Sequence, residues 1–261
     1  MNIYDIAKEA GVSISTVSRV LNDKGYVSEK TKARIQEVLK KNKYQPSAIA
    51  RGLVSGTMKN VAIVTVDVRH PHYAMTTFIM EQKLTGLGYM VLVCNTGSRK
   101  EECMKYIRML SRNQVEGVIL VGSEFNDLCD PKELGELLPE TPIVMANGEL
   151  KLPNVQSVLV DEGYGVQLAV QHLYDKGHRN IAFVMDVKKD AGIRKRDGFL
   201  RKMKQLGYDD AAERILYTKY GAGGGEEAAK KIVGGSRRFD AVIFTEDLTA
   251  VYAMNALQNM G

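Results

Sequence analysis

The sequence contains few cysteines and no long apolar run, and both absences exclude classes of protein. Its three cysteines are Cys94, Cys103 and Cys129, an odd number without the spacing of a disulfide framework or a metal site, which indicates a reducing compartment. No apolar stretch approaches the roughly 18 residues that a membrane helix needs, and no secretory-signal pattern begins the chain. We therefore expect a cytoplasmic protein that does not contact a membrane.

Recognisable catalytic, metal and cofactor motifs are also missing. The glycine-rich stretch 221–225 resembles a phosphate loop, but no Lys-Ser or Lys-Thr pair follows and the dinucleotide-loop spacing fails at Glu226, so we expect a helix N-cap loop there. No cysteine or carboxylate completes a metal site around the two close histidine pairs, which are His70 with His72 and His172 with His178. The order of residues reveals no Ser-His-Asp or paired-carboxylate arrangement. The prediction is a protein that is not an enzyme and holds no metal or cofactor.

The charge distribution gives the chain one strongly basic end. With 261 residues, 44% of them apolar, the chain can form one large domain or two to three smaller ones. Residues 1–59 hold eleven Lys or Arg and five Asp or Glu, a net charge of +6, whereas residues 60–261 have a net charge of −1. Because the excess positive charge lies in the first segment alone, this segment has the electrostatic character of a nucleic-acid-binding domain.

Two short helices joined at a glycine are expected at the start of the chain. The first has apolar residues at positions 3, 6, 7 and 10, the spacing of one helix face, and ends at Gly11. Ser13 is placed to cap the second helix, which turns Val17, Val20 and Leu21 inward. Its outward face and N-terminal end hold Ile14, Ser15, Thr16, Ser18 and Arg19. This pattern predicts a helix-turn-helix that reads DNA; a merely structural hairpin is the alternative, which the local charge disfavours.

A third helix and a short conditional helix follow. Ser28 is expected to cap the third helix, whose apolar stripe includes Ile35 and Val38, and the residue before Pro46 is held extended, so the helix ends there. Residues 47–56 form a segment that is too short to be a stable helix alone, yet it presents an apolar face. Such a face on an isolated short helix needs a partner.

These N-terminal residues resemble the DNA-binding end of the lactose/galactose repressor (LacI/GalR) family. The matching stretches are "IYDIAKEAGVSISTVSRVLN", "VSEKTKARI" and "YQPSAIARGLVSG". In that family the second helix enters the major groove, and the resemblance assigns base reading to Ile14, Ser15 and Arg19. It assigns phosphate contacts to Ser13, Thr16, Ser18, Asn22, Ser28 and Thr31, and it places Ala50 and Leu53 on hinge helices that pair in the minor groove. The chemistry agrees, because Arg can donate two hydrogen bonds to guanine, hydroxyls bind phosphate and an apolar wedge can kink a base step.

From Asn60 the pattern changes to strands that alternate with helices. Strands are expected at 61–66, 90–94, 117–121, 142–145, 181–184, 215–217 and 241–244, and helices at 73–87, 101–112, 134–138, 164–176, 194–206, 226–233 and 248–260. The stretch 155–161 separates the first series from the second. Strands without polar alternation predict parallel sheets covered on both faces. The expected fold is an all-α helix-turn-helix domain (1–44), a hinge and linker (45–59), and an α/β core of two doubly wound parallel-sheet lobes (60–158 and 159–261).

The core resembles the effector core of the same family, which is akin to periplasmic binding proteins. The stretches "HPHY", "VEGVIL", "VDEGYGVQLAVQHLYDKGHRNIAFV" and "AVIFTEDLTA" carry this match. Family members continue past Gly261, so we expect a C-terminally truncated chain with an incomplete second lobe. Two positions depart from the family: Lys195 stands where an Arg usually binds the ligand, and Glu246 stands where an Asn is usual. Lys lacks the planar fork of Arg and Glu adds a charge, which makes a plain neutral sugar a poorer fit.

Ligands of open α/β sheets bind beyond the carboxyl ends of the strands, and two lobes form a cleft there. Nine residues are therefore expected to bind the effector: Asp67, His72, Tyr73, Ser123, Asn147, Asp161, Lys195, Glu246 and Asp247. The alternative for each of them is a solvated strand end or a helix cap.

Together these observations predict a cytoplasmic, homodimeric transcriptional repressor. Its expected partners are a palindromic double-stranded DNA operator and a small-molecule effector, a sugar or sugar derivative, that controls DNA affinity from the cleft. Two alternatives stay open: a solute-binding protein with the same core and no role at DNA, and a regulator controlled by a protein partner. A Rossmann-like enzyme is a third class, which would require a bound cofactor.

Overall fold

The computed structural model describes residues 2–22, 25–44 and 57–260. They fall into two compact units, Met1–Asn60 with Gly88–Met90, and Val61–Leu87 with Val91–Gly261. Over these described ranges, none of the helices combines the length and the apolar character that crossing a membrane requires.

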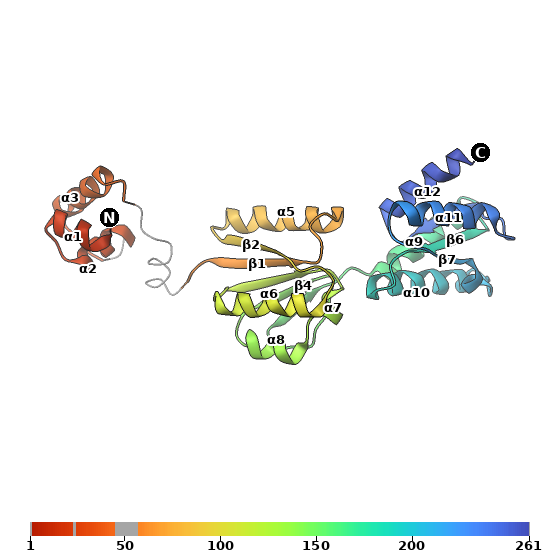
Figure 1. The fold of residues 1–261 in the computed structure, drawn as a ribbon, viewed down its shortest axis with the longest axis horizontal. Coiled ribbons are helices and arrows are strands. Elements are labelled where there is room, and N and C mark those ends of the chain that lie inside the picture. Colours follow the sequence, from red (N-terminus) through yellow and green to blue (C-terminus); the bar gives the residue numbers. More distant parts are fainter. Residues whose placement is uncertain (1, 23–24, 45–56, 261) are drawn as a thin grey trace. The chain divides into compact units, whose positions relative to one another are not determined.

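In the described part of the N-terminal unit, three helices pack around a small apolar core (Figure 1). They are α1 (Ile3–Ala10), α2 (Ile14–Asn22) and α3 (Glu29–Lys41). Asn2 and Asp5 form a reciprocal capping box at the start of α1, and Gly11 ends the helix in the left-handed conformation, with φ of 63°. The Ser28 side chain accepts a hydrogen bond from the Thr31 amide and caps α3, as the sequence predicts. The buried core residues are Ile6, Ala7, Ala10, Val17, Ile35 and Val38.

A five-stranded sheet forms the first lobe of the second unit. Its strands are β1 (Asn60–Thr65), β2 (Met90–Asn95), β3 (Gly117–Val121), β4 (Ile143–Ala146) and β5 (Val155–Val158), in the order β2-β1-β3-β4-β5. The pairs β1–β3, β3–β4 and β4–β5 are parallel. Helix α5 (Pro71–Gly86) lies on one side of the sheet, and α6 (Lys100–Arg112) and α8 (Pro131–Leu137) lie on the other (Figure 1). Every residue of β1 is buried, as its continuous apolar run predicts for a strand covered on both faces.

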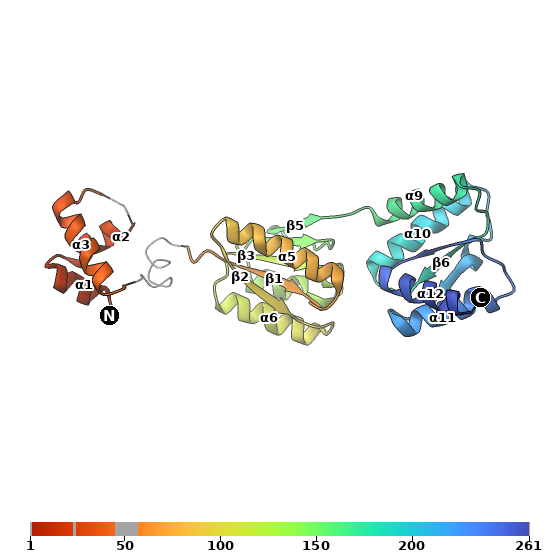
Figure 2. The same cartoon turned by 90° about the horizontal axis from the view of Figure 1, so that it is seen from above.

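A three-stranded parallel sheet forms the second lobe (Figure 2). Its order is β7-β6-β8, and its elements are α9 (Glu162–Asp175), β6 (Ile181–Met185), α10 (Asp190–Gln205), β7 (Ile215–Tyr217), α11 (Ala222–Gly234), β8 (Ala241–Phe244) and α12 (Asp247–Asn259). Successive side chains of β6 pack into two different apolar clusters. Phe183 packs with Phe199 of α10, whereas Val184 packs with Ala228 of α11 and Ala253 of α12. The sheet is therefore covered on both faces, which is the expected doubly wound arrangement.

Two helices begin earlier than the sequence analysis places them, and in both cases a glycine is the reason. Helix α10 begins at Asp190 instead of about residue 194, and α11 begins at Ala222 instead of residue 226. A Cβ at Gly192 would lie 1.9 Å from the Val187 carbonyl oxygen, and a Cβ at Gly224 would lie 1.5 Å from the Lys219 carbonyl oxygen. Each glycine lies in the first turn of its helix, where the backbone passes close to the segment just before it. In the sequence, glycine at these positions indicates a loop, and the helices are therefore predicted to begin later than they do.

Two short elements are absent from the sequence analysis altogether. They are α7 (Phe125–Leu128) and the 3₁₀ helix η1 (Ala211–Arg214). Each is a single turn of four residues, which is too short to produce a helical period in the sequence. Gly221 does precede α11 as its N-cap, with φ of 84°, as expected for the start of the glycine-rich stretch.

Candidate functional site

The exposed face of α2 carries the residues expected to read bases. Ile14, Ser15 and Arg19 are exposed, whereas Val17 on the opposite side of the helix is fully buried. The aliphatic part of the Arg19 side chain lies beside Gly25, 3.6 Å from where a Cβ would stand. The three side chains therefore share one accessible helix face, which is the geometry that insertion into a major groove needs.

Hydroxyl groups cluster at the N-terminus of α2. Ser13 Oγ lies 2.8 Å from both Ser15 Oγ and Thr16 Oγ1, and it accepts a hydrogen bond from the Thr16 amide at 3.3 Å. At the other end of the helix Asn22 Nδ2 donates to the Ser18 carbonyl oxygen at 2.9 Å and lies 3.3 Å from Ser18 Oγ. Donors at a helix N-terminus, together with the helix dipole, form a local environment that suits a phosphate group.

The N-terminus of α3 repeats this arrangement. Ser28 Oγ lies 2.9 Å from Thr31 Oγ1, and both side chains stand at the first turn of the helix. The expected hinge residues Ala50 and Leu53 lie outside the described residues.

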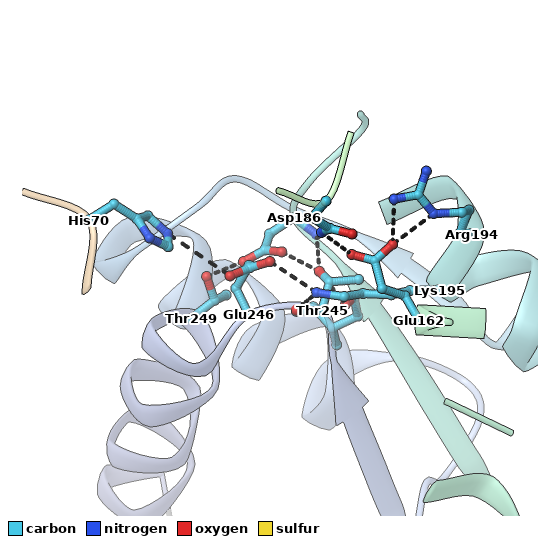
Figure 3. Close-up of polar contacts among 10 residues, drawn as sticks. His70, Glu162, Asp186, Arg194, Lys195, Thr245, Glu246 and Thr249 are labelled. Carbon is cyan, nitrogen blue, oxygen red and sulfur yellow. Dashed lines mark hydrogen bonds and ion pairs between the residues drawn. The ribbon is translucent and has the colours of Figure 1, made fainter. Parts of the chain in front are cut away.

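In the α/β core, Lys195 and Glu246, the two positions that the sequence resemblance marks as departures, contact each other. Lys195 Nζ, on α10, lies 3.2 Å from Glu246 Oε1, next to the start of α12, and donates to the Thr245 carbonyl oxygen at 2.7 Å (Figure 3). Both charged side chains are about three-quarters buried, with 23% and 24% of their surface exposed. The sequence identifies each departure separately, but the structure joins them in one ion pair at the carboxyl end of β8.

An aromatic group lies beside this ion pair. The His70 ring lies 5.1 Å from the ring of Tyr73 and stacks on Tyr220 at 5.4 Å, both measured between ring centroids. His70 Nε2 lies 4.0 Å from Glu246 Oε2. Burial, followed by the negative charge of Glu124, raises the pKa of the Tyr73 phenol. His70 and Tyr73 follow β1 and Glu246 follows β8, so these contacts connect the ends of the first and last strands of the core.

A second carboxylate, Asp186, follows β6 directly and accepts hydrogen bonds from two hydroxyl groups. Its two oxygens are bound by Thr245 Oγ1 and Thr249 Oγ1 (Figure 3). The Thr249 hydroxyl also accepts from the Gly221 amide at 3.0 Å. Burial raises the pKa of the Tyr220 phenol, and the nearby carboxylates raise it further; they belong to Glu246, Asp186, Asp67 and Asp247.

A pocket of about 580 Å³ opens beside the segment that connects the two lobes. It is lined by Asn126, Glu149, Lys151, Leu159, Val160, Asp161, Asp190 and Arg194. Asn126 Nδ2 donates to Asp190 Oδ2 at 2.7 Å. At the edge of the pocket Arg194 Nε donates to Glu162 Oε2 at 2.8 Å (Figure 3). Asn147 Nδ2 donates to the other oxygen, Glu162 Oε1, at 2.9 Å.

Of the nine residues expected to bind an effector, Lys195 and Glu246 contact each other directly, and Tyr73 is connected to them through the ring of His70. Asp161 lines the pocket and caps α9 by accepting from the Tyr164 amide, and Asn147 donates to Glu162. Four others have weaker connections to the group: Asp67, His72, Ser123 and Asp247. Hydrogen bonds from Arg69 hold the pKa of Asp67 at about 2, and the His72 ring lies 5.5 Å from that of Tyr73. Ser123 is buried and Asp247 is exposed.

Five residues of this region are not predicted from the sequence, namely His70, Glu162, Asp186, Arg194 and Tyr220. Asp186 follows a predicted strand immediately, so the strand-end rule applied to every strand would find it. The others depend on contacts between distant segments; for example, the Arg194 side chain reaches Glu162 across 32 positions of sequence.

Comparison with known families accounts for both units. Residues 2–47 match the model of bacterial regulatory proteins of the lacI family, and residues 58–261 match the model of periplasmic binding proteins and the sugar-binding domain of the LacI family. The chain belongs to the LacI family.

Relatives of this LacI-family chain cover its whole length. An HTH-type transcriptional regulator of Lachnoclostridium phytofermentans is 32% identical over 100% of the chain and 79% of the relative. The HTH-type transcriptional regulator DegA of Bacillus subtilis is also 32% identical, over 99% of the chain and 77% of DegA. A repressor named PurR, from Mannheimia succiniciproducens, is 28% identical over 99% of the chain and 77% of PurR.

Solved structures agree with this assignment. A lac repressor dimer bound to operator and to the anti-inducer ONPF superposes with a TM-score of 0.86 over 100% of the chain and 78% of that structure, at 21% identity, which establishes the shared fold. A complex of the transcriptional regulator CelR with cellobiose matches with a TM-score of 0.63 at 25% identity, over 100% of the chain and 79% of CelR. This LacI-family chain is a DNA-binding transcriptional regulator with an effector-binding α/β core.

Proposed function

We propose that this chain represses transcription by binding a palindromic operator as a homodimer, and that a small effector in its α/β core controls the binding. The observation that carries the proposal is the accessible face of α2, where Ile14, Ser15 and Arg19 project from a segment with a net charge of +6. Exposed hydroxyls at the first turns of α2 and α3 supply phosphate donors on the same unit. Ala50 and Leu53 would enter the minor groove from the paired hinges.

Arg19→Ala is expected to lower the affinity for the operator by about 1–3 kcal/mol and to leave nonspecific binding nearly unchanged. Arg19 would donate to a base edge, whereas phosphates attract the whole basic unit. The operator is first selected from random duplexes by the wild-type chain, and affinities for it and for a random duplex are then measured by fluorescence anisotropy. Arg34→Ala, which removes an exposed cation of α3, is the control. Equal losses on both duplexes from Arg19→Ala would contradict base reading by this residue.

The proposed dimer surface lies on α5. Met75, Phe78 and Ile79 follow each other at helical spacing and are 60%, 59% and 48% exposed, whereas Tyr73 and Thr77 of the same helix are buried. An exposed apolar stripe on a helix is typical of a protein interface. A second copy of this chain is the proposed occupant, because the lac repressor that shares this fold is described as a dimer on its operator.

Phe78→Glu is expected to convert the dimer to a monomer, because it places a charge in a desolvated interface. Loss of the second half-site contact should weaken operator binding about 100-fold or more. Light scattering coupled to size exclusion gives the mass, and anisotropy gives the affinity. Phe78→Leu keeps the apolar character and should remain dimeric. A Phe78→Glu chain that stays dimeric at micromolar concentration would exclude α5 as the interface.

The proposed effector site is the group of strand-end residues around Tyr73, Lys195 and Glu246. It is supported by the match of residues 58–261 to a sugar-binding domain, and CelR with its bound cellobiose is an example of a ligand in a relative. An effector can change the affinity for DNA only if it binds one conformational state of the dimer more tightly than the other. The other six predicted residues would contact a larger effector, or an effector around which the site closes. They are Asp67, His72, Ser123, Asn147, Asp161 and Asp247.

A further inference from the structure

The proposed effector site contains more negative than positive side chains. Glu246, Asp186, Asp67 and Asp247 all lie near enough to Tyr220 to raise the pKa of its phenol, and Glu124 acts in the same way on Tyr73. Within the described residues, the cations that contact these five carboxylates are Lys195, on Glu246, and Arg69, on Asp67. Five carboxylates against two cations leave a net negative charge at the carboxyl ends of β1, β3, β6 and β8.

The cations of the site are already engaged. Lys195 Nζ is held by Glu246 Oε1 at 3.2 Å and by the Thr245 carbonyl oxygen at 2.7 Å, and Arg69 forms two hydrogen bonds with Asp67, at 2.9 and 2.8 Å. At the pocket, Arg194 is likewise paired with Glu162. An anionic ligand would have to displace one of these carboxylates and would face the others in a half-buried site of reduced dielectric, where repulsion is strong. The site therefore disfavours phosphates and carboxylic acids.

Acceptors and ring faces remain available in the same place. Among the described residues, Glu246 Oε2 approaches no cation closer than His70 Nε2 at 4.0 Å, and Glu124 Oε2 is buried beside the Tyr73 phenol. His70 and Tyr220 stack beside Glu246, and the faces of aromatic rings attract cations. His70 Nδ1 is also buried with no hydrogen-bond partner in the described part of the chain. Carboxylates next to ring faces are the combination that recognises an ammonium group.

On the basis of the proposed function, we infer that the effector is a polyhydroxylated amine, of which an amino sugar is the simplest type. Its ammonium group would lie between Glu246 and Asp186, next to Tyr220, and its hydroxyls would bond Glu124 and His70. A neutral sugar would satisfy acceptors but would leave the excess negative charge in place, whereas one ammonium group offsets part of it. The Lys195–Glu246 pair stays intact in this arrangement, because Lys195 uses the other oxygen of Glu246.

The test compares matched ligands that differ only at one position. The purified chain is titrated calorimetrically, without DNA, with glucosamine against glucose, galactosamine against galactose, and 2-aminoethanol against ethylene glycol, with glucose 6-phosphate as the anionic probe. Each amine is expected to bind at least tenfold more tightly than its hydroxyl counterpart. No preference for the amines, no detectable binding of any amine at millimolar concentration, or tighter binding of the phosphate would overturn the inference.

Two variants locate the subsite. Glu246→Gln and Asp186→Asn are expected to reduce amine binding at least tenfold while changing binding of the neutral partner less than twofold. Glu227→Gln is the control, since this carboxylate lies on α11 and is bound to Lys231, away from the group. Equal effects of all three variants would overturn the assignment. Operator binding of the same preparations is measured separately. A chain that binds the operator but shows no amine preference would contradict the inference about the effector. A chain that binds amines but no operator would contradict the proposed function instead.

Discussion

Gly198→Ala is expected to lower the free energy of unfolding of the α/β core by about 3 kcal/mol, the upper part of the range for forced overpacking. A Cβ at this position would lie 2.2 Å from the carbonyl oxygen of Gly163 and 2.7 Å from its carbonyl carbon. The two glycines let the backbones of α9 and α10 touch, and a backbone cannot move aside as a flexible side chain can. The added methyl group must therefore separate the two helices or unwind a turn of one.

The same substitution should also impair the effector site. Lys195 and Arg194 project from the same turn region of α10 as Gly198, so a shift of this helix would pull Lys195 from Glu246. Urea denaturation followed by circular dichroism measures the stability, since the chain has no tryptophan to report on folding. The matched control is Gly165→Ala on α9, where a Cβ meets nothing within 4 Å. That change should stabilise the helix by about 0.5–1 kcal/mol. Equal stabilities of the two variants would show that the contact between α9 and α10 is not tight.

Much of the fold follows from the sequence because strand and helix periods are local properties. The strands at 117–121, 215–217 and 241–244 have the predicted bounds, and other elements differ by a few residues at their ends. The larger errors occur at Gly192 and Gly224, where a residue type that favours loops is retained inside a helix by a close backbone contact. That contact is tertiary information, which no period in the sequence contains.

The site is less predictable than the fold for the same reason. The strand-end rule locates its edge, and the resemblance to a family marks Lys195 and Glu246 as unusual. Neither reveals that these two side chains, 51 positions apart, compensate each other's charge. His70 and Tyr220 are 5.4 Å apart in space but come from opposite ends of the core sequence. An ion pair and a ring stack of this kind can be inferred only after the strands are assigned to their order in the sheets.

The other large effect is expected in the DNA-binding unit, at Ile35. This side chain is fully buried among Ile6, Ala10 and Val17, at the place where α3 meets α1 and α2. Ile35→Ala should cost about 3 kcal/mol, from lost transfer free energy and from the cavity that remains. A three-helix unit of this size has only a few kcal/mol of stability, so much of the population should lose its folded reading face.

A graded series distinguishes loss of folding from loss of a DNA contact. Ile35→Val should cost about 1 kcal/mol and leave operator affinity close to that of the wild-type chain, whereas Ile35→Ala should lower it tenfold or more. Gln36→Ala, at the exposed neighbouring position, is the control and should leave the affinity unchanged. Amide hydrogen exchange measures the stability of α1 to α3 in each full-length chain, and the thermal transition of the α/β core should not move. The affinity loss should follow the loss of protection, because Ile35 does not face the DNA. An Ile35→Ala chain that keeps full protection of α1 but loses operator binding would contradict this order of cause and effect.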